Sequence, residues 1–100
     1  MRKREMSYND HGMTKEEVKY VSDFCKNANE KEKEYIREAL SSLSPYIASY
    51  VYLSLIEGVS YDRMEREHYI YINKYDFYAY RRCGIAAIKR WMILYGIWEK

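Results

Sequence analysis

Hydrophobic residues recur every three or four positions along most of the chain, which is the spacing that buries one face of an α-helix. The first such segment follows Thr14, and Glu17 stands three residues later, so the pair has the sequence signature of a capping box. The first helix is therefore predicted to begin after Thr14 and to end near residues 27–29. Its apolar stripe consists of Val18, Val21, Phe24 and Cys25.

Two further helices are predicted from residues that favour helix ends. Asn29 can cap a second helix, on which glutamates and lysines alternate along the side that faces water. Ser44 followed by Pro45 is typical of the start of a third helix, and Gly58 supplies a left-handed residue at its end. This third helix is apolar on nearly every side, so we expect it to be central. The stripe of the second helix consists of Tyr35, Ile36, Ala39, Leu40 and Leu43.

The last part of the chain contains two more predicted helices. Ser60 can cap a short polar helix that is anchored by Tyr61 and Met64. Asn73 can cap the longest helix, which runs from Lys74 to beyond residue 92. No segment has the pattern of a strand, and 4 glycines and 1 proline are few for a fold rich in tight turns. The sequence therefore predicts an all-α fold, a compact bundle of about five helices.

A length of 100 residues suits one domain with one core. Residues 1–13 mix charged residues with Asn, Asp and Gly and show no period, so they are predicted to form a flexible N-terminal arm. Residues 14–100 are predicted to form a single helical domain. Within it, a short helix, a connection and a longer helix have the layout of a helix-turn-helix at about residues 59–92.

Basic residues gather toward the end of the chain. Residues 1–57 contain nine Lys and Arg against ten Asp and Glu, whereas residues 58–100 contain eight against five. Between residues 73 and 90 five basic residues stand against one acid. This distribution favours a polyanionic partner. The 13 tyrosines add rings whose hydroxyls can meet a phosphate, a base edge or a protein backbone.

A helical wheel, drawn at about 100° per residue, divides the last helix into two faces. The face predicted to be core consists of Phe77, Tyr80, Gly84, Ala87, Ile88, Trp91 and Tyr95. The opposite face consists of Lys74, Tyr78, Arg81, Arg82, Ile85 and Lys89. Arginine can donate a fork of hydrogen bonds to guanine or phosphate, and the N-terminal residues of a recognition helix contact base edges. The predicted DNA-binding residues are Lys74, Tyr75, Tyr78, Arg81, Arg82 and Lys89. Two alternatives remain open, a solvated basic face and partial burial of the two tyrosines.

The pattern in the last 45 or so residues resembles the phage and mobile-element transcription regulators of the ArpU/RinA type, which are related to sigma-factor region 4. The matching residues are Gly58, Ser60, Tyr61 and Met64, then Ile72, Asn73, Phe77, Tyr78, Tyr80 and Arg81, followed by apolar positions around Ile85 and Ile88. The resemblance implies sequence-specific binding to double-stranded DNA, regulation of phage genes and contact with RNA polymerase. The connection between the last two helices departs from the motif, because it is longer and lacks a glycine, and residues 69–72 could instead form an extended wing.

The sequence gives little support for other classes of function. No catalytic arrangement or phosphate-binding loop is present, so we expect no enzyme activity, no small-molecule substrate and no cofactor. The spacing of His11, His68, Cys25 and Cys83 does not predict a metal site, and the thiols are expected to stay reduced in the cytoplasm. The apolar segments are too short to cross a membrane.

Two expectations concern partners. A homodimer would double the DNA half-sites, with the first two helices as its natural surface. The competing hypothesis is a helical module, phage-encoded or not, that binds a protein through tyrosine and arginine and binds no DNA.

Overall fold

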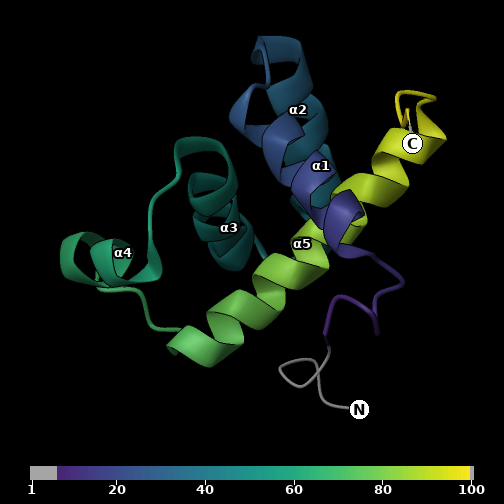
Figure 1. Ribbon diagram of the computed structural model, residues 1–100. Coiled ribbons are helices and arrows are strands. Elements are labelled where there is room, and N and C mark those ends of the chain that lie inside the picture. The colour runs from purple at the N-terminus through teal and green to yellow at the C-terminus, as the bar shows by residue number, and fades with distance from the viewer. Residues whose placement is uncertain (1–6, 100) are drawn as a thin grey trace.

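The computed structural model describes residues 7–99, which form five α-helices and one 3-10 turn, with no strand in that part of the chain (Figure 1). The all-α prediction is confirmed. The elements are α1 (Lys15–Lys26), α2 (Glu30–Ala39), η2 (Leu40–Ser42), α3 (Pro45–Glu57), α4 (Tyr61–His68) and α5 (Lys74–Leu94).

The predicted helix starts are confirmed, because each helix begins at a side chain that accepts a hydrogen bond from a backbone N–H of its first turn. Thr14 and Glu17 form a capping box on α1, and Asn29 and Glu32 form another on α2. The remaining helices are capped by Ser44, Ser60 and Asn73. Gly58 ends α3 with φ 67°, in the left-handed region where a side chain would be strained.

α3 packs against α1, α2 and α5, so it lies centrally as expected, but α5 is buried more completely. α5 packs against α1, α2 and α3. Its middle is buried on every side, and the small residues Gly84, Ala86 and Ala87 let the neighbouring helices approach it closely. A Cβ at Gly84 would lie 2.8 Å from a methyl of Leu40. α3 buries only Val51 and Leu55, because its other apolar residues lie on a side that no helix covers fully.

Two positions on α5 differ from the helical wheel. Ile85 was placed on the outer face, yet it is fully buried, because three helices surround this part of α5. Tyr95 was placed in the core, yet 48% of it is exposed, because it follows the last residue of α5 and its ring stacks on Tyr35 and Trp91 at the surface. A wheel assumes one buried face, and a central helix has no exposed face in its middle.

The segment before α1 lies against the bundle from residue 7 onward. Ser7–Gly12 forms a turn, Tyr8 is half-buried, and Met13 is 2% exposed in the core. The described part of the predicted arm is therefore held by apolar contacts, which the absence of a helical period did not reveal. Residues 1–6, with their basic sequence, lie outside the described residues.

Candidate nucleic-acid interface

α4, the connection and the start of α5 lie together at one side of the molecule, away from α2 and the C-terminus (Figure 1). Tyr69 directly follows α4 and adopts the left-handed conformation, with φ 52° and ψ 49°. The predicted turn thus contains its left-handed residue, although no glycine is present. Residues 69–72 form no strand, so the wing alternative is not observed.

Apolar contacts hold α4 against α5. The Tyr61 and Phe77 rings lie 5.7 Å apart between centroids, and Phe77 and Met64 are fully buried. Ile70, in the connection, is also buried. The Tyr61 hydroxyl donates a hydrogen bond to the carbonyl of Ile72, which fixes the end of the connection. These contacts place the first turn of α5 in a defined position at the molecular surface.

Two of the predicted DNA-binding residues stand out from that first turn. Tyr75 is 75% exposed, and the Lys74 side chain is 55% exposed. The Lys74 Nζ lies 3.6 Å from an Asp62 carboxylate oxygen, an ion pair in solvent that costs little to exchange for a phosphate. Both residues are therefore accessible to a partner.

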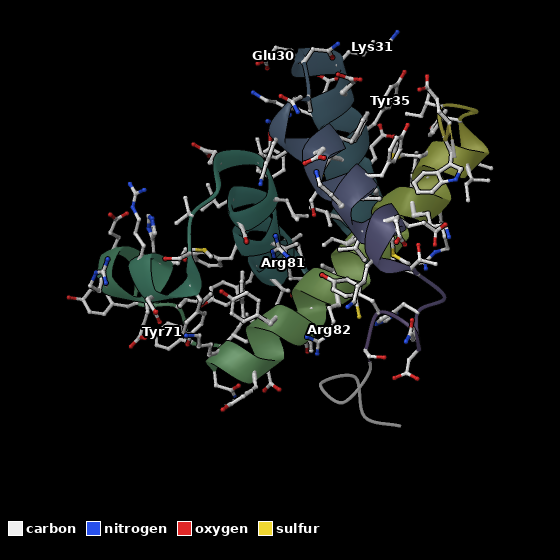
Figure 2. The ribbon with its side chains drawn as sticks, in the orientation of Figure 1. Glu30, Lys31, Tyr35, Tyr71, Arg81 and Arg82 are labelled. Atoms are coloured by element: carbon white, nitrogen blue, oxygen red, sulfur yellow. The ribbon has the colours of Figure 1, made fainter. Side chains whose placement is uncertain are left out.

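The remaining predicted residues also contact their own chain. Arg81 is half-buried, and its Nε donates a 3.0 Å hydrogen bond to the Ser54 hydroxyl of α3. Figure 2 places Arg81 between α3 and α5, with Arg82 on another side of α5. Arg82 is half-buried and interacts within the chain as well. Tyr78 is half-buried and packs edge-to-face on Phe77, at 5.3 Å between ring centroids.

Lys89 joins α5 to α1. Its Nζ lies 2.7 Å from a Glu17 carboxylate oxygen and 5.5 Å from the centre of the Trp98 ring. The hydrogen bond from Lys89 holds the pKa of Glu17 below its ordinary value, and the backbone N–H of Thr14 acts in the same direction. Lys89 thus has a structural role at the far end of α5 from the exposed turn.

The side formed by α4 and the start of α5 carries charges of both signs. Residues 61–78 contain four acids, Asp62, Glu65, Glu67 and Asp76, and three basic residues, Arg63, Arg66 and Lys74. The excess of positive charge lies farther along α5. Attraction of this surface to a polyanion is therefore weaker than the count over residues 73–90 indicated.

Sequence reasoning missed three tyrosines that surround the same turn. Tyr69 is 75% and Tyr71 is 90% exposed, and Tyr46 from the start of α3 is 41% exposed. The Tyr46 hydroxyl accepts a 2.7 Å hydrogen bond from the backbone N–H of Tyr71. For Tyr69 and Tyr71 the signal was available in "EHYIYINKY", where tyrosines alternate with isoleucines and no helical stripe occurs. Tyr46 lies outside this segment. Together with Tyr75 these residues form a tyrosine cluster around the connection.

Residues 7–99 give no support for other kinds of site. No group of three or more metal-binding side chains occurs there, although the Cys83 sulfur lies 3.9 Å from a His11 ring nitrogen. Both cysteines are free thiols, and burial raises the pKa of Cys25 to about 12. None of the helices described is long and apolar enough to cross a membrane.

Comparison with known proteins yields no match to a family model, to a curated protein or to a solved structure. The resemblance to the ArpU/RinA type therefore stays a prediction from the sequence pattern.

Proposed function

We propose that the chain binds double-stranded DNA as a transcriptional regulator, using α4 and α5 as a helix-turn-helix. The observation that carries this proposal is the exposed first turn of α5. Asn73 caps this turn, and the packing of α4 against α5 holds it at the molecular surface. In helix-turn-helix proteins, the N-terminal residues of the second helix contact base edges. Lys74 and Tyr75 occupy that position here.

The proposed contact surface contains fewer residues than the six that the sequence predicted. Lys74 and Tyr75 make the groove contacts, and Tyr71 lies in the connection beside them. Tyr78, Arg81 and Arg82 follow along α5 and contact their own chain. RNA polymerase contact belongs to the same proposal through the family resemblance alone.

The test is a gel shift with upstream and random DNA at low and moderate salt. We expect Lys74→Ala and Tyr75→Ala to weaken binding, and Lys74→Ala to reduce the salt slope by about 1. Lys31→Ala is the matched control, because it removes the same charge from the exposed side of α2 (Figure 2). Equal affinity of all four proteins, or no shift at low salt, would contradict the proposal.

A second candidate is a protein-binding module that uses the tyrosine cluster. The observation that favours it is the combination of exposed tyrosines with charges of both signs, which is typical of protein interfaces. Binding by such a surface should change little with salt, whereas DNA binding should fall steeply. Capture of a host protein that Tyr71→Ala and Tyr75→Ala abolish, with no DNA shift in any condition, would favour this candidate.

A further inference from the structure

A second exposed surface lies at the opposite end of α5 from the proposed DNA contact. Leu94 is 76% exposed, and it borders a hollow between the end of α2 and the C-terminal part of α5. The half-buried Trp91 and the buried Ala39 and Ala87 line this hollow, together with the exposed Ser41 and Ser42. We call Tyr35, Ala39, Ala87, Trp91, Leu94 and Tyr95 the α2–α5 patch.

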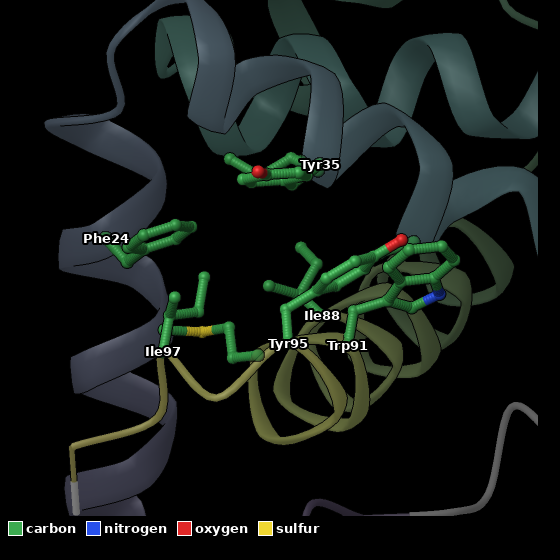
Figure 3. Close-up of a pocket in the computed structure, with 9 residues that line it drawn as sticks. Phe24, Tyr35, Ile88, Trp91, Tyr95 and Ile97 are labelled. Atoms are coloured by element: carbon green, nitrogen blue, oxygen red, sulfur yellow. The ribbon is translucent and has the colours of Figure 1, made fainter.

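Three stacked rings make the patch rigid. Tyr95 stacks on Trp91 at 4.9 Å and on Tyr35 at 5.2 Å, measured between ring centroids, so one stack connects α2 with α5. Beneath the rings, Phe24 of α1 and Ile88 fill the joint between the three helices (Figure 3). A partner would meet preformed aromatic surface, so little conformational entropy is lost when it binds.

The charges at the rim of the patch complement one another. Arg90 lines the hollow from α5, and Glu38 lies one turn of α2 after Tyr35, beside it on the helix surface. Both side chains are exposed, and within residues 7–99 neither forms an ion pair. In a two-fold symmetric interface, each residue of one copy meets the other residue of its partner. Arg90 of each copy can therefore pair with Glu38 of the other copy, which gives two ion pairs, one on either side of an apolar centre.

We propose that the α2–α5 patch is the interface of a symmetric homodimer, with a second copy of this chain as its occupant. An isologous contact requires a self-complementary surface, and opposite charges at the rim of one apolar patch meet that requirement. α5 has 21 residues and is about 30 Å long, so the patch leaves the first turn of α5 in each copy uncovered. The proposal rests on the patch alone and does not depend on DNA binding.

Sedimentation of the full chain over a concentration series, up to about 300 µM, tests the dimer. We expect a concentration-dependent dimer for the wild type and a monomer for Leu94→Asp, which changes an exposed side chain and should leave the helical circular dichroism unchanged. Tyr71→Asp is the control, because it adds the same charge at the other end of the molecule. A monomeric wild type overturns the proposal, as does a Leu94→Asp variant that dimerises like the wild type.

Charge exchange tests whether the partner is a second copy in this arrangement. Arg90→Glu places two carboxylates opposite each other across the interface, and Glu38→Arg places two guanidinium groups opposite each other, so each variant alone should dimerise at least tenfold more weakly. A mixture of the two should form a heterodimer at nearly wild-type strength, because both contacts across its interface join a carboxylate of one variant to a guanidinium group of the other. If the mixture associates no better than either variant alone, Arg90 and Glu38 do not face each other across the interface and the proposal fails.

The two proposals fail in different ways. A wild type that stays monomeric at every concentration, yet shifts DNA that contains a single half-site, would remove only this inference. An intact dimer that shifts no DNA would remove only the proposed function.

Discussion

Tyr69 is the only non-glycine residue with positive φ in the described part of the chain, at φ 52°. A left-handed conformation costs an L-residue with a Cβ about 1–2 kcal/mol. The residue ends α4 at the point where the chain must turn toward α5, and its backbone N–H donates to the carbonyl of Glu65. The connection therefore stores strain that a glycine would release.

We predict that Tyr69→Gly stabilises the fold by about 0.5 kcal/mol, because the relief of strain exceeds the entropy that glycine loses on folding. Tyr71→Gly is the control, since Tyr71 is exposed and has no positive φ, and it should be neutral or destabilising. Urea unfolding of the three proteins measures the difference. A Tyr69→Gly variant less stable than Tyr71→Gly would show that the ring of Tyr69 contributes more than its backbone strain costs.

A second single residue that determines local packing is Gly84, because it has no side chain to fill the core beside it. Its missing side chain accommodates Leu40 and Val51, whose methyls would lie 2.8 Å and 3.0 Å from an added Cβ. We expect Gly84→Val to destabilise the protein by about 1–3 kcal/mol through overpacking. Tyr75→Val, at an exposed position of the same helix, should change the free energy of unfolding by only a few tenths. Similar values for the two variants would mean that the core repacks around position 84.

At the scale of elements, the ion pair between Glu17 and Lys89 joins the first turn of α1 to α5. The pKa of Glu17 lies below its ordinary value of 4.5, chiefly because of Lys89. A lowered pKa means that the folded state favours the charged carboxylate. The contribution to stability is therefore present above pH 4.5 and is lost as the pH falls below that value.

We predict that Lys89→Met is less stable than the wild type at pH 7, and that the difference shrinks at pH 3. The Thr14 cap on Glu17 stays intact in this variant, so the change reports the ion pair and the Trp98 contact. Chemical unfolding at both pH values measures it, with Lys31→Met as a control that should show no such pH dependence. A difference that is equal at pH 3 and pH 7 would assign the effect to packing of the Lys89 side chain.

At the scale of the whole molecule, α4 is the element most separated from the bundle (Figure 1). Its attachment depends on a few buried side chains, among them Tyr61 and the fully buried Phe77. Local opening of such an element needs less free energy than global unfolding. The proposed interface is thus built on the least firmly held part of the fold, whereas the α2–α5 patch is built on the core helix.

We expect the amides of α4 to exchange hydrogen faster than those in the middle of α5. Phe77→Ala should cost about 3–5 kcal/mol and raise exchange in α4 first. Ile88→Ala, in the joint between α1, α2 and α5, should instead raise exchange throughout the bundle. Equal protection of α4 and α5 in the wild type would contradict this order.

The sequence by itself determined the helices and their ends. Thr14, Asn29, Ser44, Ser60 and Asn73 each cap a helix through a hydrogen bond to its own first turn, so the information is local and can be read from neighbouring residues. The helical class and the position of the turn before α5 followed from the same signals.

Only the tertiary structure decided which helix is most fully buried and which basic side chains are accessible. Gly84 and Ile85 are buried because three helices meet there, and Arg81 is engaged because Ser54 lies across from it, 27 positions away in the chain. A helical wheel contains no information about such distant neighbours. The exposure of a side chain depends on the assembled surface. For that reason, the proposed contacts are limited to Lys74 and Tyr75, and the exposed tyrosines around them could be identified only in the fold.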